Sequence, residues 1–337
     1  MMNILIASHL YPPSVGGIES VTRILAEQFA KAGHAVSVVT ETAEPDGEAS
    51  LVKVHRNPDG RTRLRLMQWC DVFFQSNVSL RSLWPLAIRR KAWAVAHHTW
   101  IRRPDGRTNW QDVLKLRLLR YATNICVSKA IAERLDLPSI VITNPYDADV
   151  FRFHQGNSRS TELIFVGRLV SDKGVDLLLR SLRVLRGLGI TPRLTIVGTG
   201  PEESSLRSFC HENGLDTQIT FAGSVTGSAL AELLNTHLIM VVPSRWAEPF
   251  GIVALEGLAC GCSLIGSEEG GLKEAIGTCG ITFPNGNIEE LAASIERLLI
   301  DSQLRAQLSA NVHQHLSNHH PMVVASKYLA IFEALPK

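Results

Sequence analysis

The chain has 337 residues, which is long enough for two domains with separate hydrophobic cores. Its composition, 45% hydrophobic and 20% charged residues, is that of a globular protein and excludes a disordered or fibrous chain. No apolar run approaches the roughly 18 residues that a membrane-spanning helix needs. The formal net charge of +2 conceals a strongly basic first half.

In the first half, strands are predicted at NILIAS (3–8), AVSVVT (35–40), DVFFQS (71–76), AWAVAH (92–97) and NICVS (124–128). A helix from about Ile18 to Ala32, with Gly33 as its C-cap, separates the first two strands. Because the first residues read as a strand, we expect no signal peptide. Gly16 and Gly17 stand just before this helix, where they would let backbone amides approach a phosphate.

Basic side chains far outnumber acidic ones between Arg56 and Arg134. A membrane surface or a phosphorylated acceptor fits this charge, and so does a solvated basic face. We expect no nucleic-acid partner, because the chain lacks a groove-reading motif and an aromatic platform for single strands. The basic residues of this segment are Arg61, Arg63, Arg65, Arg81, Arg89, Arg90, Lys91, Arg102, Arg103, Arg107, Lys115, Arg117 and Arg120.

The stretch WQDVLKLRLLRY (110–121) combines apolar residues at helical spacing with flanking cations, as in an interfacial helix. One hypothesis is that it meets an anionic membrane surface or a lipid-diphosphate-linked acceptor. The alternative is that its apolar stripe belongs to the core. The stripe consists of Trp110, Val113, Leu114, Leu118 and Tyr121.

The second half repeats the alternation of strands and helices. Its strands are predicted at ELIFVG (162–167), RLTIVG (193–198), ITFAG (219–223), HLIMVV (237–242) and CSLIG (262–266), with helices near 175–187, 201–213, 228–235 and 251–260. The segment 142–160 shows neither the helical nor the strand spacing of apolar residues, and we interpret it as a hinge. Short apolar strands, each followed by a helix, specify parallel sheets covered on both faces. We therefore predict an α/β fold of two doubly wound, Rossmann-like domains facing each other across a cleft, with the boundary between residues 1–146 and 147–321.

The stretch IVGTGPEES (196–204) is not a dinucleotide-binding fingerprint. That fingerprint needs a third glycine where this chain has Glu203. It reads instead as a tight strand-to-helix turn, with Pro201 as a suitable first helical residue.

Two cations follow the first strand of the second domain, in FVGRLVSDKG (165–174). Arg168 would leave the strand tip and Lys173 would precede the next helix, so both should project from the carboxyl edge of the sheet. An arginine fork and a lysine point charge both suit phosphate oxygens.

The stretch EPFGIVALEGLACG (248–261) predicts an anion site at a helix start. Pro249 suits the first helical turn, and the amides of Phe250, Gly251 and Ile252 would be available to a phosphate. If both glutamates lay along one helix axis, Glu248 and Glu256 would be about 12 Å apart, roughly the span from a hexose across a diphosphate to a ribose. In the simpler interpretation Glu248 is an N-cap acid and Glu256 is an exposed helix charge, although apolar neighbours surround Glu256.

These stretches together resemble the retaining GT-B glycosyltransferases of family GT4. The resemblance runs through PPSVGGIESVTRILAEQFAKAGHAVSVVT (12–40), FVGRLVSDKGVDLLL (165–179), IVGTGP (196–201), ITFAGSV (219–225), VVPSRWAEPFGIVALEGLACGCSLIGSEEGGLKEAI (241–276) and KYLAIFEAL (327–335). The resemblance implies that a last helix, about 322–337, crosses back onto the first domain. Two features depart from the family: NPYD (144–147) replaces the usual Asn-Gly-Val-Asp, and the first domain is short.

The resemblance also implies roles for individual residues. Arg168 and Lys173 would bind the donor diphosphate, and Glu256 the ribose. Glu248, with the Phe250-Gly251-Ile252 backbone, would contact the transferred sugar and the phosphates, and Gly16 and Gly17 would close the site from the first domain. The family places a histidine at an N-domain strand tip near the donor sugar, for which this chain offers His97 or His98. We favour His98 slightly, and a packed core histidine is the alternative reading.

The implied function is retaining transfer of a sugar from a nucleoside diphosphate sugar to an acceptor hydroxyl, in glycan, glycolipid or small-glycoside biosynthesis. The alternatives are a GT-B epimerase, a phosphorylase, or a donor-binding subunit without turnover. No cofactor and no metal site are expected, since the six cysteines show no zinc spacing and Cys260-x-Cys262 is a lone pair. We expect a cytoplasmic protein with buried thiols, in peripheral contact with the inner face of the membrane if the basic face binds lipid. His313, His315, His319 and His320 should lie on a solvated helix surface.

Overall fold

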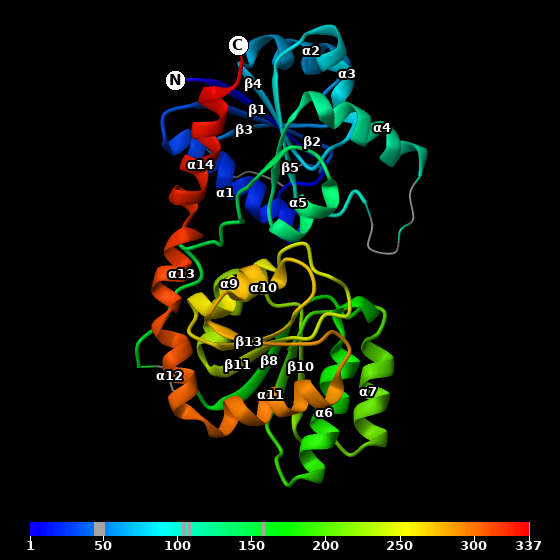
Figure 1. Ribbon diagram of the computed structural model, residues 1–337, viewed down its shortest axis with the longest axis vertical. Helices are drawn as coiled ribbons and strands as arrows, with labels where there is room; N and C mark the ends of the chain where they lie inside the picture. The colour runs from blue at the N-terminus through cyan, green and yellow to red at the C-terminus, as the bar shows by residue number, and fades with distance from the viewer. Residues whose placement is uncertain (44–50, 103–105, 107–108, 157–158, 337) are drawn as a thin grey trace. The chain divides into compact units, whose positions relative to one another are not determined.

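The computed structural model describes residues 1–43, 51–102, 106, 109–156 and 159–336. Two of the basic residues noted above, Arg103 and Arg107, lie outside these described residues. The chain divides into an N-terminal unit, Met1–Pro145 with His319–Lys337, and a C-terminal unit, Tyr146–Asn318. The last segment of the chain therefore belongs to the same unit as the first (Figure 1).

The N-terminal unit is built on a parallel sheet with the strand order β3-β2-β1-β4-β5-β6-β7. Its strands are β1 (Asn3–Ser8), β2 (Ala35–Thr40), β3 (Lys53–Arg56), β4 (Val72–Ser76), β5 (Ala92–His97), β6 (Thr123–Cys126) and β7 (Ser139–Val141). Its helices are α1 (Gly17–Lys31), α2 (Gly60–Trp69), α3 (Leu80–Ile88), α4 (Trp110–Leu118) with the 3-10 turn η1 (Leu119–Tyr121), α5 (Lys129–Leu135) and α14 (Pro321–Ala334).

The connections assign the helices to the two faces of this sheet. Across the sheet, the connection from β1 to β2 runs toward the β3 edge. The connections from β3 to β4, from β4 to β5 and from β5 to β6 run the other way, toward the β7 edge. Because crossovers between parallel strands are right-handed, α1 covers one face, while α2, α3 and α4 cover the other. Figure 1 shows α2, α3 and α4 together, away from α1 and α14.

Helix α14 packs on the same face as α1. The rings of Tyr328 and Phe332 meet those of Phe29 on α1 and Phe74 on β4, with centroid separations of 5.4 to 6.3 Å. All four side chains are buried. The predicted helix at about 322–337 is therefore α14, and its aromatic residues complete the core of the N-terminal unit.

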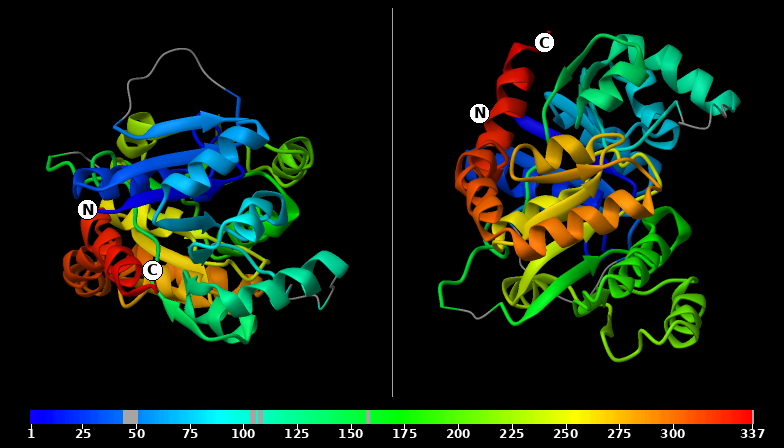
Figure 2. Two further views of the ribbon diagram at one scale, coloured as in Figure 1. Left: turned by 90° about the horizontal axis from the view of Figure 1, so that it is seen from above. Right: turned by 60° about the horizontal axis from the view of Figure 1, so that its bottom comes forward.

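The C-terminal unit is built on a second parallel sheet, with the strand order β10-β9-β8-β11-β12-β13. Its strands are β8 (Thr161–Val166), β9 (Leu194–Val197), β10 (Ile219–Gly223), β11 (His237–Val242), β12 (Ser263–Ser267) and β13 (Gly280–Phe283). Its helices are η2 (Ser171–Lys173), α6 (Val175–Gly187), α7 (Glu203–Glu212), α8 (Gly227–Asn235), α9 (Ile252–Ala259), α10 (Leu272–Ile276), α11 (Ile288–Ile300), α12 (Ser302–Ala310) and α13 (Val312–Asn318). Helices α6 and α11 pack together on one face of this sheet (Figures 1 and 2).

The ten strands predicted from the sequence are all present, and the described residues form three further strands that were not predicted. These are β3, β7 and β13, and each lies at an edge of its sheet. The residues of β3 and β7 are mostly exposed or half-buried, so neither strand is a continuous apolar run. Helix α7 begins at Glu203, so Pro201 precedes the helix instead of opening it.

The chain passes between the units near Asn144 and again near His319. The Nδ1 atom of His319 lies 3.0 Å from the carbonyl oxygen of Asn144, which ties these two passages together within the N-terminal unit. The prediction of a solvated His319 was wrong, because this residue is only 4% exposed. Its contact with the carbonyl of Asn144 depends on how the chain returns to the unit, and no local pattern indicates that.

We expect Phe332→Ala to lower the free energy of unfolding of the N-terminal unit by about 3–5 kcal/mol, because it leaves a cavity among three aromatic rings. Urea denaturation followed by tryptophan fluorescence measures this, since most tryptophans belong to this unit. The control is Met322→Ala on the same helix, a side chain that is 63% exposed and should change the value by less than about 0.5 kcal/mol. Equal losses in the two variants would contradict the assigned packing.

Candidate functional site

Two loops at the carboxyl edge of the C-terminal sheet are joined by backbone hydrogen bonds. The loop after β8 carries Asp172, whose carbonyl oxygen accepts from the amides of Arg245 at 2.8 Å and Trp246 at 3.3 Å in the loop after β11. Gly174 has a φ of 66°, and a Cβ there would lie 2.0 Å from the carbonyl oxygen of Pro243. The close approach of the two loops therefore requires glycine at this position.

Lys173 and Glu248 form an ion pair between these loops. The Nζ atom of Lys173 lies 2.5 Å from Oε1 of Glu248, and the hydroxyl of Ser244 donates to the same oxygen at 2.7 Å. The side chain of Glu248 is 11% exposed and that of Lys173 28%. A carboxylate this buried is costly unless it is paired, so the contacts with the lysine and the serine compensate the burial of Glu248 at this edge.

Helix α9 begins one residue after a glycine in the left-handed conformation. Gly251 has φ 93° and ψ 60°, and a Cβ there would lie 2.5 Å from Cδ1 of Leu272. Among the described residues, the amides of Gly251 and Ile252 donate to no protein acceptor. They stand at the positive end of the helix, where an anion is favoured.

This geometry corrects part of the expectation from sequence. The helix starts at Ile252, so Pro249 and Phe250 precede it and Glu248 is not on its axis. The span of about 12 Å along one helix does not apply, and the helical part from Ile252 to Glu256 covers only about 6 Å. The left-handed glycine turns the chain before the helix begins, and spacing along the sequence does not reveal this.

Glu256 lies on α9 and is only partly exposed. Burial raises the pKa of its carboxyl group to about 7, and the negative charge of Asp147 contributes in the same direction. Glu256 is thus a carboxyl group poised between its neutral and charged forms near neutral pH. Sequence reasoning noticed its apolar neighbours but did not anticipate Asp147.

Arg168 is an exposed cation at this edge. In the part of the chain that the structure describes, its guanidinium has no ion-pair or hydrogen-bond partner, whereas Lys173 is engaged by Glu248. The prediction treated the two cations alike, and the structure separates them. One fixes a carboxylate and the other remains available to an anion from outside.

The glycines of GTGP (198–201) lie at the same edge of the sheet and pack against the loop after β8. A Cβ at Gly198 would lie 1.9 Å from the carbonyl oxygen of Gly167, and one at Gly200 would lie 2.3 Å from that of Leu169. The amide of Leu169 also donates to the carbonyl of Thr199 at 2.9 Å. These glycines are needed because the turn packs directly against the backbone on either side of Arg168, which explains them without a dinucleotide.

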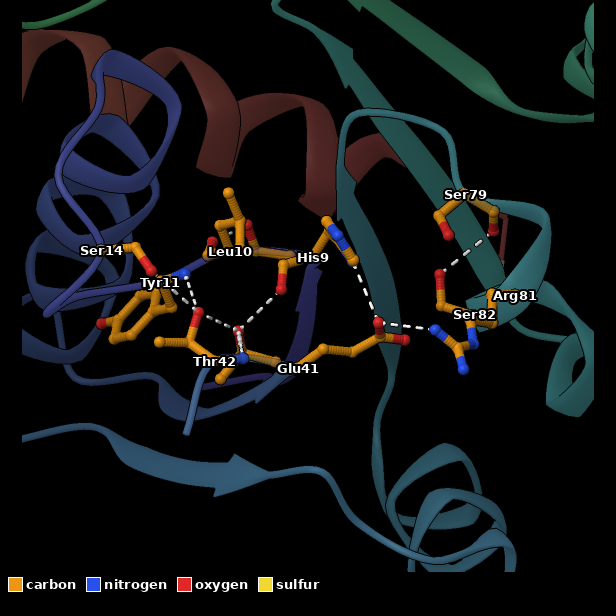
Figure 3. A network of polar contacts seen from close by, with 11 residues as sticks. His9, Leu10, Tyr11, Ser14, Glu41, Thr42, Ser79, Arg81 and Ser82 are labelled. Atoms are coloured by element: carbon orange, nitrogen blue, oxygen red, sulfur yellow. Dashed lines mark hydrogen bonds and ion pairs between the residues drawn. The ribbon is translucent and has the colours of Figure 1, made fainter. Parts of the chain in front are cut away.

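In the N-terminal unit, the loop that leads to Gly16 and Gly17 is anchored by a polar network (Figure 3). The amide of Tyr11 donates to the hydroxyl of Thr42 at 3.0 Å, and the hydroxyl of Ser14 lies 3.3 Å from the same oxygen. Beside it, Glu41 pairs with both His9 at 3.1 Å and Arg81 at 2.8 Å. None of these partners was predicted, because they come together only at the carboxyl ends of β1, β2 and β4.

Gly16 is the N-cap residue of α1 and has extended backbone. A Cβ there would lie 2.4 Å from the carboxylate of Glu19, a side chain that is itself buried. The carboxylate of Glu19 thus lies directly against Gly16, and the predicted contact of Gly16 with a phosphate stays a prediction.

The structure separates the two neighbouring histidines. The Nε2 atom of His97 lies 2.9 Å from the Oδ1 atom of Asn124 on the neighbouring strand, and burial lowers the pKa of His97 to about 4. His97 is thus a packed core histidine, because its side chain faces the adjacent strand. This was the less favoured of the two interpretations of the sequence.

His98 is held by its backbone instead of by its ring. Its amide donates to Oδ1 of Asn77 at 2.8 Å, while both ring nitrogens are buried without a well-formed hydrogen bond among the described residues. Burial lowers the pKa of His98 to about 4, with a smaller effect of His97 in the same direction and an opposing one of the Asn144 side chain. His98 is a neutral imidazole with unused hydrogen-bonding capacity, so it remains the candidate of the pair.

Asn285 is a further residue that sequence reasoning missed. Its side-chain amide donates to the carbonyl of Ser244 at 3.1 Å and its Oδ1 atom accepts from the amide of Glu269 at 3.0 Å. No signal in the sequence marks Asn285, whereas Ser244 could have been found from its position four residues before Glu248. Within the described residues, no group of three or more His, Cys, Asp or Glu side chains could hold a metal ion.

Comparison with known proteins identifies the family. Residues 148–315, about half of the chain, match the family model described as glycosyl transferases group 1. The chain belongs to the group 1 glycosyl transferases. This glycosyltransferase is 27% identical to an uncharacterized glycosyltransferase of Methanocaldococcus jannaschii over 92% of both chains. It is 30% identical to the alpha-D-kanosaminyltransferase of Streptomyces kanamyceticus, but over only 44% of this chain and 39% of that protein.

Solved structures show the same architecture. The sucrose-phosphate synthase of Thermosynechococcus elongatus superimposes with a TM-score of 0.82 at 19% identity over 99% of both chains. The Anabaena protein HepE, solved with UDP-glucose, gives a TM-score of 0.79 at 18% identity over 99% of this chain and 100% of that one. The prediction of an α/β fold of the GT-B type is confirmed.

We expect Glu256→Gln to stabilise the glycosyltransferase at alkaline pH. The pKa of Glu256 is higher in the folded protein, about 7, than in the unfolded chain, about 4.5. The neutral carboxyl group therefore contributes stability that is fully present below pH 4.5 and is lost as the pH rises through about 7. Glutamine avoids that loss, so the free energy of unfolding at about pH 8 should rise by about 1–3 kcal/mol. Urea denaturation at several pH values measures the difference, which should vanish near about pH 4.5. Glu232→Gln, at an exposed glutamate on α8, should show no such dependence; a pH-independent effect of Glu256→Gln would refute the assigned pKa.

Proposed function

We propose that this glycosyltransferase moves a sugar from a nucleoside diphosphate sugar to an acceptor hydroxyl and retains the anomeric configuration. The carboxyl edge of the C-terminal sheet would bind the donor. One observation carries the proposal: the start of α9, with available amides at Gly251 and Ile252, is combined with an exposed Arg168 and with a glutamate already neutralised by Lys173. That combination suits a diphosphate flanked by hydroxyl groups.

The ion pair removes an objection to this site. Two carboxylates beside a diphosphate would repel it, but Lys173 compensates Glu248, and Glu256 is half-protonated near neutral pH. A carboxylate accepts two neighbouring hydroxyl hydrogens well, and both a hexose and a ribose present such pairs. In the proposal Glu248 contacts the transferred sugar and Glu256 the ribose. The Anabaena protein HepE, which shares the fold, was solved with UDP and with UDP-glucose.

The proposed reaction breaks the bond between the anomeric carbon and the leaving diphosphate oxygen and forms one from the same carbon to the acceptor oxygen. The acceptor proton passes to an oxygen of the leaving diphosphate, on the same face of the sugar. Arg168, Lys173 and the α9 amides would stabilise the negative charge that develops on the diphosphate. From the N-terminal unit, the proposal keeps Gly16 and Gly17 as partners of the donor phosphates and His98 as a partner of the sugar.

The proposal places the reaction in the cytoplasm, in glycan, glycolipid or small-glycoside biosynthesis. All six cysteines are free and buried, and burial raises the pKa of Cys126 and of Cys262 to about 11. Such thiols are unreactive and suit a reducing compartment. No helix among the described residues is long and apolar enough to cross a membrane.

We expect Arg168→Ala to lower kcat/KM by about 30-fold to 1000-fold, because it removes about 2–4 kcal/mol of charge stabilisation in the transition state. Thermal shift with UDP-, GDP- and ADP-sugars selects the donor first, since a ligand at about 100 times its Kd adds about 2.7 kcal/mol. Release of the nucleoside diphosphate in the presence of acceptor then gives the rate, and NMR of the product gives its anomeric configuration. Arg297→Ala, at an exposed arginine on α11, is the control.

Near-wild-type turnover of Arg168→Ala would overturn the assignment of Arg168. Inversion at the anomeric carbon would overturn the proposed mechanism. Donor binding without transfer to any acceptor would favour a non-catalytic donor-binding subunit.

Glu248→Gln and Glu256→Gln should affect different steps. We expect Glu248→Gln chiefly to lower kcat and to weaken discrimination between sugars, because its partner would be the transferred sugar. Glu256→Gln should chiefly weaken the binding of the free nucleoside diphosphate, because its partner would be the ribose. Isothermal titration with that nucleotide measures the second effect; if Glu248→Gln is the weaker binder, the donor lies in the opposite orientation.

A further inference from the structure

Large apolar side chains are exposed on α3, α4 and η1 of the N-terminal unit. Trp110 is 71% exposed and Tyr121 85%, and Val113 and Leu114 between them are 45% and 38% exposed. On α3, Ile88 is 60% exposed. The alternative that the apolar stripe of residues 110–121 belongs to the core is therefore wrong for four of its five members.

Buried residues attach this segment at its two ends. Leu119 in η1 is completely buried, and Leu118 is half-buried. At the other end of α4, Asp112 is buried in a capping box with Asn109 and lies 3.7 Å from Lys115. The helix is thus fixed by its two ends, while Val113, Leu114 and Arg117 between them are exposed. Exposed apolar groups gathered in this way mark an interaction surface.

Cations surround these apolar side chains. Arg117 and Arg120 on α4 and η1, and Arg89 and Arg90 at the end of α3, are exposed, and within the described residues none of them forms an ion pair with an acidic side chain. The one acidic residue of α4 and η1 is Asp112, which is buried. The exposed surface of α4 and η1 is therefore positively charged, and no exposed acidic side chain on these two elements offsets that charge.

The two helices belong to one surface. Helices α3 and α4 cover the same face of the N-terminal sheet, in successive crossovers, and α2 with its arginines continues that face beside α3. Trp84 of α3 lies across the start of α2, since a Cβ at Gly60 would be 3.7 Å from its ring. Helices α1 and α14 lie on the opposite face of the sheet, as Figures 1 and 2 show.

We propose that the exposed surface of α3, α4 and η1, termed here the α3–α4 face, docks on an anionic phospholipid bilayer. Tryptophan and tyrosine favour the boundary between headgroups and acyl chains, and arginines beside them are attracted to anionic headgroups. A helix of nine residues cannot span a bilayer, so it would lie in the plane of the interface. Nucleic acid would attract the cations, but it offers nothing to the aliphatic Ile88, Val113 and Leu114.

Vesicle flotation tests this inference without any turnover, so its failure is distinguishable from a failure of the proposed function. At low salt, wild-type protein should float with vesicles of phosphatidylglycerol and phosphatidylcholine and not with phosphatidylcholine alone. Arg117→Glu/Arg120→Glu should reduce partitioning by at least about 30-fold, from the loss of two cations near the surface. Trp110→Ser/Tyr121→Ser should abolish the binding that persists at about 0.5 M salt, where charge is screened.

The matched control is Lys31→Glu/Lys327→Glu, which changes the net charge equally on exposed residues of α1 and α14, on the opposite face of the sheet. It should bind vesicles as well as wild-type protein. No flotation of the wild-type protein at low salt, or an equal loss in the control, would overturn the proposal. Binding of single-stranded DNA in place of vesicles, lost in Arg117→Glu/Arg120→Glu, would assign the face to nucleic acid and also overturn it. Unchanged thermal unfolding of each variant confirms that it is folded.

Discussion

The ion pair of Lys173 with Glu248 joins the loops that follow β8 and β11, and the rest of the candidate site depends on it. These loops leave the two central strands of the C-terminal sheet, which pair directly. The pair holds a carboxylate that would otherwise be too costly to bury, and Ser244 completes its hydrogen bonding. Since the carbonyl of Glu248 also accepts from the amide of Gly271 at 2.7 Å, the same residue fixes the loop before α10.

The close packing of these loops explains why glycine recurs at the edge. Gly174, Gly198 and Gly200 would each place a Cβ within 2.3 Å of a backbone carbonyl. Each glycine lets one loop pass directly over another, and together they leave the start of α9 and the side chain of Arg168 at the surface they build. The chemistry proposed here therefore rests on backbone contacts as much as on the charged residues themselves.

The sequence predicted the central strands because each is a continuous apolar run, and it predicted Arg168, Lys173, Glu248 and Glu256 as a group because they follow strand ends or lie on one helix. It could not predict β3, β7 and β13, since these three edge strands are only three or four residues long and mostly exposed or half-buried. The structural role of His97 depends on a partner 27 residues away, and the raised pKa of Glu256 depends on Asp147 from the predicted hinge. Such pairings arise from the tertiary fold, so spacing along the chain carries no trace of them.

The central claim is that the carboxyl edge of the C-terminal sheet binds the diphosphate of a nucleotide sugar. A crystal structure with the bound donor tests it most directly. The account predicts diphosphate oxygens within about 3 Å of the amides of Gly251 and Ile252 and of the guanidinium of Arg168, with the ribose hydroxyls on Glu256. A nucleotide bound elsewhere, with the α9 amides and Arg168 still facing solvent, would contradict it.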